Sequence, residues 1–325
     1  MQNLKGKSMD KSKLNPHFQQ LDVDYLYHLG LDSSMDLKNE FGDVKYVVLT
    51  RSFSNADYFT NRFTLSWYGL KDVDISCKTI AKDERYHIYK VGNTLIISHG
   101  VGFPSMLICL NEVVKLMWHA GVEDYKFIRF IPGFGLNVAA GSVVVACETL
   151  NPELKPEWKN IEFGEEYTYQ TNLDLKMASD LVAASPDHCT RLGFYDYNVK
   201  CNAKNPNQEI TTIVGKVMSS SGYFSGPYRF NSATVPSYTP QEQKEYLAKA
   251  TDAGVCGIDL EASCFAAFCE EFKIPGSIVM AVMGDRLQED EFEPSFVRDD
   301  DQLSPALTRA GQVIINYILS NSKRD

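Results

Sequence analysis

The chain has 325 residues, which is enough for one large α/β domain or two domains of ordinary size. Its content of 44% hydrophobic and 23% charged residues is typical of a globular protein, and no run of about 18 apolar residues indicates a membrane span. The formal net charge of -10 excludes an overall basic surface, so we expect neither nucleic acid nor a membrane as a partner.

The N-terminal segment is polar and rich in Lys, Ser and Asn, which predicts a disordered lead over residues 1–19. It holds no apolar core of the kind found in a secretory signal. No later shift in composition marks a boundary, so the sequence predicts a single domain over residues 20–325.

From residue 45 onward, short apolar runs alternate with segments of helical periodicity. In chain order we predict strands at 45–50 and 93–100, a helix at 104–121, strands at 125–131 and 141–147, a helix at 173–184, a strand at 210–219, helices at 240–254 and 260–273, a strand at 276–284 and a helix at 304–321. This alternation predicts a parallel or mixed sheet with helices on both faces. Binding loops are then expected beyond the carboxyl ends of the strands.

The eight cysteines form no C-x-x-C pair, and several lie in apolar runs. We therefore expect buried, reduced thiols and a cytoplasmic protein, with no metal site.

One stretch raises a specific question. In "RFIPGFG" (129–135), Arg129 ends an apolar run and two glycines follow, which predicts a strand entering a tight turn able to hold an anion. Pro132 and Phe134 argue against this, because proline offers no N–H and phenylalanine blocks a close approach. The stretch is thus either an anion pocket or the remnant of one.

A family resemblance begins at "SHGVGFPSMLICLNEVVKL" (98–116). The pattern Gly100-x-Gly102-x-Pro104-Ser105 followed by a helix resembles the signature of the purine/uridine nucleoside phosphorylases. Further pieces resemble animal uridine phosphorylases in order and spacing, among them "LYHLGL" (26–31), "ERYHIYKVGNTLIISHGVGFPS" (84–105), "ATDAGVCGIDLEASCFAA" (250–267) and "GDRLQED" (284–290).

The resemblance covers about residues 24–320 and implies a three-layer α/β/α nucleoside-phosphorylase fold with a central mixed sheet. It also implies the family reaction, in which uridine and phosphate give uracil and ribose 1-phosphate. Phosphate would be a co-substrate, and no cofactor is expected. The resemblance further implies a homodimer that shares site residues across its interface and binds nucleosides and phosphate-like molecules.

The implied phosphate residues are only partly present. Arg129 and Arg85 match family arginines, and the partner subunit supplies the second of these in the family. Arg51 stands where the family has a glycine, and Asn55 stands where it has an arginine. Arg51 either swings inward to replace that charge, fills the cavity or points to solvent. Without the resemblance, Arg129 would be taken for a strand-end arginine paired with a surface carboxylate.

The loop after Arg129 departs from the family's Gly-Thr-Ser/Thr-Gly pattern. This chain has Ile131, Pro132, Gly133 and Phe134 there, so the threonine that serves phosphate and ribose is lost.

For the ribose, the resemblance implies His28, which the partner subunit supplies in the family, and Glu261 with Leu260 in place of the family's Met-Glu pair. A carboxylate suits two neighbouring hydroxyls. Taken alone, Glu261 would be a carboxylate favoured at a helix N-terminus, and His28 a packed residue at a subunit contact.

For the base, the resemblance implies Arg229 and, in place of a stacking phenylalanine, Tyr223. The glutamine that pairs with the uracil edge is Pro227 here, and proline cannot make that pairing. Asp285 stands where uridine phosphorylases have asparagine, which suggests either a drift toward purines or simply an exposed strand-end residue.

Three interpretations follow. We favour a uridine phosphorylase paralogue, a pseudoenzyme with weak or lost phosphorolysis that keeps nucleoside or anion binding. The alternatives are an active nucleoside phosphorylase with a rearranged phosphate site, and a purely structural dimeric paralogue.

Overall fold

The computed structural model describes residues 9–71, 73–81, 85–185, 210–288 and 305–322. The chain falls into two compact units, the first formed by residues 1–128 and 268–276 and the second by 129–267 and 277–325. Strands β6 (Lys126–Gly135) and β12 (Gly276–Asp285) and helix α6 (Ala262–Phe272) each have residues in both units. This division concerns compactness alone, and the single domain over 20–325 stays a prediction.

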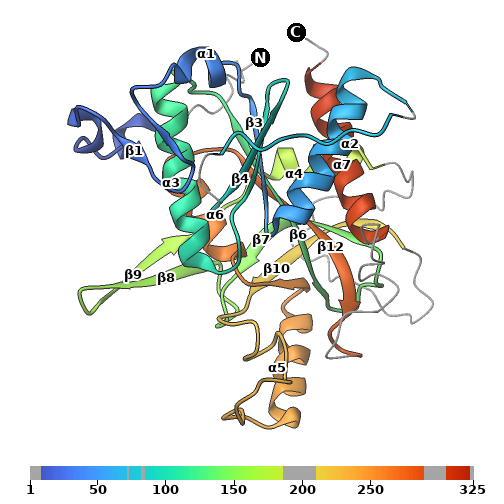
Figure 1. Ribbon diagram of the computed structural model, residues 1–325. Coiled ribbons are helices and arrows are strands. Elements are labelled where there is room, and N and C mark those ends of the chain that lie inside the picture. Colours follow the sequence, from blue (N-terminus) through green and yellow to red (C-terminus); the bar gives the residue numbers. More distant parts are fainter. Residues whose placement is uncertain (1–8, 72, 82–84, 186–209, 289–304, 323–325) are drawn as a thin grey trace, which may run out of the picture. The chain divides into compact units, whose positions relative to one another are not determined.

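The first unit is built around three strands and the start of β6. Its elements are the short strands β1 (Tyr25–Leu26) and β2 (Leu31–Asp32), helix α1 (Leu37–Phe41), strand β3 (Tyr46–Thr50), helix α2 (Phe53–Tyr68), strands β4 (His87–Val91) and β5 (Thr94–Ser98) and helix α3 (Phe103–His119). Strand β5 pairs parallel with β3 and antiparallel with β4. Helix α2 packs against β4 and β5, and α3 passes beside α1 and β1 (Figure 1).

The second unit holds the remaining elements. They are strands β7 (Val143–Leu150), β8 (Glu157–Glu162) and β9 (Glu165–Gln170), helix α4 (Leu175–Ala183), strand β10 (Thr212–Ser219), helix α5 (Pro240–Asp252), strand β11 (Val255–Asp259) and helix α7 (Pro305–Ser322). Strand β10 pairs parallel with β7 and β11, while β12 pairs antiparallel with β7. The sheet is therefore mixed, as predicted. Figure 1 shows β8 and β9 as a hairpin that continues from β7.

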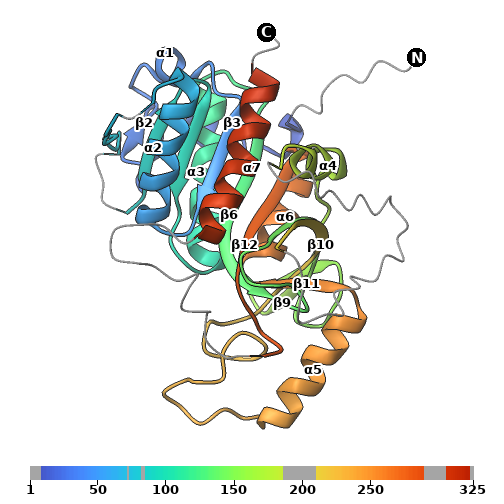
Figure 2. The same cartoon turned by 90° about the vertical axis from the view of Figure 1, so that its right-hand side faces the viewer.

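The segment between β10 and α5 carries the predicted base residues and lies beside α5 (Figure 2). Gln243 of α5 donates from Nε2 to the carbonyl of Gly226 at 2.6 Å, and the hydroxyl of Tyr238 lies 3.4 Å from the same oxygen. Helix α5 begins with a capping box formed by Thr239 and Glu242, which satisfies backbone donors at its N-terminus.

The predicted turn in "RFIPGFG" is not present. Strand β6 continues through Pro132 to Gly135, and its last residues pair antiparallel with β11, Phe134 opposite Ile258. The two glycines serve close packing instead. A Cβ at Gly133 would lie 2.5 Å from the sulfur of Met280 and 2.8 Å from the carbonyl of Ile258. Because β6 stays extended through Gly135, this stretch forms no tight turn of the kind that holds an anion.

The described part of the predicted N-terminal lead, residues 9–19, contains local structure. Two short 3-10 helices, Lys11–Lys13 and Phe18–Gln20, lie in it, and Met9 and Leu14 are buried. The backbone N–H of Met9 donates to Glu123 at 3.2 Å. Residues 1–8 lie outside the described residues.

The prediction of reduced thiols is confirmed at five described cysteines, which are free: Cys77, Cys109, Cys147, Cys264 and Cys269. It is wrong at Cys256, which is disulfide-bonded. Cys189 and Cys201 lie outside the described residues.

Candidate functional site

The glycine-proline signature forms the N-terminus of α3. Gly102 is the N-cap residue with φ 95°, and Pro104 lies in the first turn, where its missing N–H costs nothing. Gly100 has φ 82°, a conformation that glycine adopts without strain. On α3, Ser105 contacts Arg85 and Tyr86, which lie just before β4, and Glu112 contacts the loop between β1 and β2.

Glu112 holds the loop that carries His28. Its carboxylate accepts the backbone N–H groups of His28 and Leu29, each at 3.0 Å, and its other oxygen lies 2.6 Å from Nδ1 of the His28 ring. Glu112 is buried, whereas the His28 side chain is 36% exposed. The sequence analysis used Glu112 only as part of a signature, and the structure gives it a positioning role.

Arg85 lies just before β4 and is exposed. Its Nη2 lies 3.3 Å from the hydroxyl of Ser105, and its guanidinium lies 5.7 Å from the ring centre of Tyr86. The Tyr86 hydroxyl donates to the Ser105 carbonyl at 2.9 Å. Arg85 and His28 are thus positioned by contacts with Ser105 and Glu112 of α3, while their side chains stay accessible.

Arg51 and Asn55 flank the start of α2. Ser52 is the N-cap, and its hydroxyl accepts the N–H of Asn55 at 3.3 Å. Both side chains are buried, with Arg51 only 9% exposed. Of the alternatives open for Arg51, the one in which it points to solvent is therefore wrong.

In the second unit, Arg129, Asp259 and Glu261 form a fully buried ionic cluster. The Arg129 guanidinium donates to both Asp259 oxygens, the longer bond measuring 3.2 Å from Nη2 to Oδ1, and to Oε2 of Glu261. The N–H of Glu261 adds a bond to Asp259 at 3.1 Å. All three side chains have zero exposure. The pairing of Arg129 with a carboxylate matches the interpretation made without the family resemblance. The pair is buried, however, rather than at the surface.

This cluster has an electrostatic consequence. One guanidinium faces two carboxylates, so the ionised set carries one net negative charge, and burial strengthens its field relative to water. The same negative field contributes to the raised pKa of the neighbouring Cys264 thiol, for which burial is the main cause. Asp259 was not foreseen as a partner. It directly follows the buried run "GVCGI", and this position in the sequence gives no sign of its partner.

The predicted base residues lie in the segment after β10. The Arg229 guanidinium lies 5.3 Å from the ring centre of Tyr223, and Tyr223 lies 5.1 Å from the ring of Tyr228. Pro227, which lies between Tyr223 and Arg229 in the sequence, is buried. Arg229 and Tyr223 are thus brought together, as a cation over an aromatic face.

Arg286 and Gln243 anchor this segment. Arg286 donates from Nε to the Tyr228 carbonyl at 2.6 Å and from Nη2 to Oε1 of Gln243 at 2.9 Å. Gln243 in turn donates to the Gly226 carbonyl. Both side chains are buried. Neither residue was predicted, because a lone arginine after a strand and a glutamine in a polar helix give no distinctive sequence signal.

Leu260 lies in an apolar cluster with Phe134 and Tyr228, and Tyr223 packs against its edge. The cluster therefore contains a predicted ribose residue and borders a predicted base residue. The rings of Phe134 and Tyr228 meet edge to face, with centres 5.2 Å apart.

Asp285 is half-buried at the end of β12. Its Oδ1 accepts the N–H groups of Asn137 at 3.3 Å and Leu287 at 3.1 Å. Burial raises the pKa of its carboxyl, and the two backbone donors offset part of that rise. Since its oxygen caps a turn, Asp285 is not the exposed strand-end residue that the sequence suggested.

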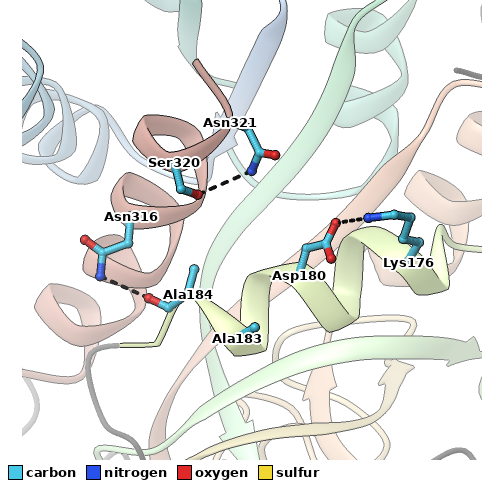
Figure 3. A pocket seen from close by; sticks show the side chains of 7 residues that line it. All are labelled: Lys176, Asp180, Ala183, Ala184, Asn316, Ser320 and Asn321. Carbon is cyan, nitrogen blue, oxygen red and sulfur yellow. Dashed lines mark hydrogen bonds and ion pairs between the residues drawn. The ribbon is translucent and has the colours of Figure 1, made fainter. Parts of the chain in front are cut away.

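A pocket lies between α4 and α7 (Figure 3). It is lined by Lys176, Asp180, Ala183, Ala184, Asn316, Ser320 and Asn321. Lys176 and Asp180 pair across one turn of α4, and the Asn316 amide donates to the Ala184 carbonyl at 3.0 Å. None of the predicted site residues lines it.

Within the described ranges, no group of three or more His, Cys, Asp or Glu residues is arranged to hold a metal ion. Over the same ranges, none of the helices has both the length and the apolarity that a bilayer crossing requires.

Comparison with known proteins identifies the family. The model of the phosphorylase superfamily matches residues 56–319. Mouse uridine phosphorylase 1 is 32% identical over 279 residues, which cover 85% of this chain and 83% of the mouse protein. A Schistosoma mansoni protein named inactive uridine phosphorylase B is 27% identical, with 95% of this chain and 96% of that protein covered.

Among solved structures, the chain resembles a uridine phosphorylase from Schistosoma mansoni in complex with uracil. The TM-score is 0.80 at 26% identity, covering 95% of this chain and 99% of that one. The predicted α/β nucleoside-phosphorylase fold with a central mixed sheet is confirmed. The chain is similarly identical to a protein named inactive and to one crystallised with uracil. Overall similarity therefore does not decide whether this chain is active, and the question depends on its site residues. The chain belongs to the phosphorylase superfamily and, within it, to the uridine phosphorylase family.

Proposed function

We propose that this member of the uridine phosphorylase family has weak or lost phosphorolysis of uridine while keeping the capacity to bind a nucleoside or an anion. The observation that carries the proposal is the buried cluster of Arg129, Asp259 and Glu261. The expected phosphate arginine and the expected ribose carboxylate neutralise each other there. Residual binding would use the family-type residues whose side chains are at least partly exposed, namely His28, Arg85 and Arg229.

Phosphate binding is weakened at three further positions. Arg51 replaces a family glycine, Asn55 replaces a family arginine, and Pro132 replaces the threonine. A charge-assisted hydrogen bond contributes roughly 1.5–3 kcal/mol, so two or three uncompensated losses weaken the complex by about 3–9 kcal/mol, or roughly 10²- to 10⁶-fold. A dianion approaching Arg129 also meets a net negative cluster, which adds to this cost.

Base recognition is weakened as well. Pro227 offers no donor to the uracil edge, and Tyr223 already lies under the Arg229 guanidinium. Leaving a polar edge of the base unpaired costs a few kcal/mol in a site built around that edge.

The test is steady-state release of uracil from uridine at saturating phosphate. We expect a rate at least ~10²-fold below that of an active family member assayed in parallel. Turnover in the ordinary range of the family would overturn the proposal.

A second candidate function is an active phosphorylase with a rearranged phosphate site. The position of Arg51 favours it, because the guanidinium is buried at the start of α2, in the loop that contacts phosphate in the family, and does not extend into solvent. Replacing Arg51 by Ala separates the two candidates. The rearranged enzyme would lose at least ~10-fold in phosphate affinity with one charge-assisted bond, whereas an impaired protein would show no change.

We also propose a homodimer with His28 and Arg85 contributed to the partner's site. Glu112 contacts the His28 ring and Ser105 contacts Arg85, yet both side chains remain accessible. This arrangement suits side chains that act across an interface. Apolar side chains that are exposed in the same unit include Tyr25, Tyr27, Val101 and Phe103. Light scattering at micromolar concentration should give about twice the chain mass, and a clean monomer would contradict the proposal.

A further inference from the structure

We propose that the outer edge of strand β9 is an interaction surface for a second copy of this chain, whose own β9 pairs with it in the antiparallel sense. This surface goes beyond the proposed function and uses neither His28 nor Arg85. Strands β8 and β9 form a separate two-stranded sheet, and every residue of β9 except Tyr169 is exposed. Figure 1 shows the hairpin projecting from β7.

The turn of the hairpin decides which backbone groups of β9 point outward. Its loop consists of Phe163 and Gly164, whose φ angles of 53° and 87° are those of a type I′ turn. Such a turn hydrogen-bonds the two residues that flank it, and bonded and non-bonded pairs then alternate along the hairpin. The N–H and C=O groups of Glu166, Thr168 and Gln170 therefore point away from β8. Among the described residues, β9 pairs with no strand other than β8.

This edge lacks the features that usually prevent pairing with another chain. Exposed edge strands are normally protected by proline, by lysine or by a bulge. The strand sequence EEYTYQ contains neither proline nor lysine, and its register with β8 is regular throughout. Tyrosine and threonine also favour extended strands. An open edge of this kind is suited to accept a further strand.

The side chains indicate that the added strand is β9 of a second copy. A two-fold axis at Thr168 places this residue opposite the same residue of the other copy. Tyr167 of each copy then lies opposite Tyr169 of the other. Glu166 lies opposite Gln170, so no carboxylate faces a second carboxylate across the pair. An interface between identical copies must be complementary to itself, and β9 meets this condition.

The aromatic face of the hairpin becomes better covered in this arrangement. Trp158 and Tyr169 are opposite each other with ring centres 5.4 Å apart, and Tyr167, on the same face, is 46% exposed. Pairing brings Tyr167 of each copy beside the ring pair of the other. On the opposite face, Lys159 lies 3.4 Å from Glu166, so the carboxylate that approaches the second copy already has a charged partner.

The experiment is residue-resolved amide hydrogen exchange of the full chain, measured from about 10 µM to about 1 mM protein. The amides of Glu166, Thr168 and Gln170 should exchange roughly 3- to 10-fold more slowly at the highest concentration. The reason is mass action, since a ~100-fold rise in concentration lowers the unpaired share of the chains by at most ~10-fold. The outward amides of Lys159 and Ile161 on β8 should show no dependence on concentration.

Thr168→Pro tests the surface directly. Proline removes the outward N–H at the centre of the edge and is tolerated where that N–H faces solvent. The variant should lose the concentration dependence at Glu166 and Gln170, while protection of the Tyr167 amide shows that the hairpin still forms. Ile161→Pro is the matched control, because it changes the outer edge of β8 in the same hairpin. It should keep the concentration dependence of the starting protein.

Exchange of the three outward β9 amides that is independent of concentration would overturn the proposal. Concentration dependence that survives Thr168→Pro would also overturn it, because the contact would then lie elsewhere. Light scattering of Thr168→Pro distinguishes this surface from the dimer proposed through His28 and Arg85, which should persist in that variant. The release of uracil remains the test of the proposed function, and its outcome does not bear on the β9 edge.

Discussion

Glu112 in the first unit and Glu261 in the second are both buried carboxylates next to a predicted site residue, but they do opposite things. Glu112 accepts backbone N–H groups and fixes a loop so that the His28 ring stays accessible. Glu261 accepts from the Arg129 guanidinium and shares it with Asp259, and none of these three charged side chains is exposed. One carboxylate keeps a predicted site residue accessible, and the other pairs with a predicted site residue inside the protein. The first unit thus keeps accessible polar groups, whereas the expected phosphate arginine of the second is internal.

The largest effect is expected from Arg129→Met. Without the guanidinium, two buried carboxylates lose a charged partner, which costs about 3–5 kcal/mol in the free energy of unfolding. Urea denaturation measures it. Arg85→Met, at an exposed position, should change stability by less than about 0.5 kcal/mol. If the two variants lose the same stability, the contrast between the units is wrong.

The triple variant Arg129→Met, Asp259→Asn, Glu261→Gln sharpens this test. It removes the charges together and should recover much of the loss, because replacing a whole buried ionic set by neutral groups is often tolerated. A triple variant as unstable as Arg129→Met would mean that packing rather than charge explains the loss.

Glu112→Ala should have the next largest effect. It leaves the backbone N–H groups of His28 and Leu29 without their acceptor, at a cost of about 1–3 kcal/mol. Hydrogen exchange of the Leu29 amide should become faster. Glu112→Gln should restore protection, since an amide oxygen can accept both N–H groups.

Asn111→Ala is the control for Glu112, because Asn111 is the exposed neighbour on the same helix. It should leave the exchange of Leu29 unchanged. Equal exchange in Asn111→Ala and Glu112→Ala would show that α3 as a whole, not the carboxylate, holds the loop.

Gly133→Ala tests whether the glycines of "RFIPGFG" serve packing. The added methyl would overlap the Met280 side chain and the Ile258 carbonyl, and overpacking of this kind costs typically 1–3 kcal/mol. Thermal unfolding measures the loss. Combining it with Met280→Ala should remove the clash with the sulfur but not that with the backbone. A neutral Gly133→Ala would restore the loop interpretation.

The sequence predicted most of the apolar strands and the amphipathic helices, although it missed the strands β4 and β11. Strand β12 was expected at 276–284 and spans Gly276–Asp285, and helix α4 was expected at 173–184 and spans Leu175–Ala183. Because these elements bury one face or both, their apolar residues recur with a period that can be recognised in the sequence.

Elements whose side chains are exposed or weakly helical were missed. The β8–β9 hairpin is largely exposed and has no apolar run, and α2 is rich in Ser, Asn, Thr and aromatic residues, whose helix propensity is low. Strand β6 was ended too early at 131, because Pro132 and two glycines look like a turn, while the pairing with β11 overrides that local preference.

The candidate site shows the same division. Family resemblance placed Arg129 and Glu261 in one site, and the structure joins them directly. No sequence pattern gave Asp259 or Arg286 a role, because their partners lie 130 and 43 residues away along the chain. Ionic clusters made by distant residues depend on the fold and leave no periodic signal.

The smallest effect is expected from Asp285→Asn, and it tests whether partial burial of a charge in the second unit carries a measurable penalty. Burial raises the pKa of Asp285 above its ordinary value of 3.8, so the folded state holds the proton more tightly than the unfolded state. The stability that this contributes is fully present below about pH 3.8 and is lost as the pH rises through the raised pKa. Asparagine does not titrate, and its oxygen can keep both backbone bonds, to Asn137 and Leu287. The melting temperature of Asp285→Asn should therefore be close to that of the starting protein at the acid end and exceed it increasingly toward pH 7. A gap that is constant with pH, or a variant that is less stable at pH 7, would show that the ionised carboxylate is stabilised by its two N–H donors and that burial carries no net penalty here.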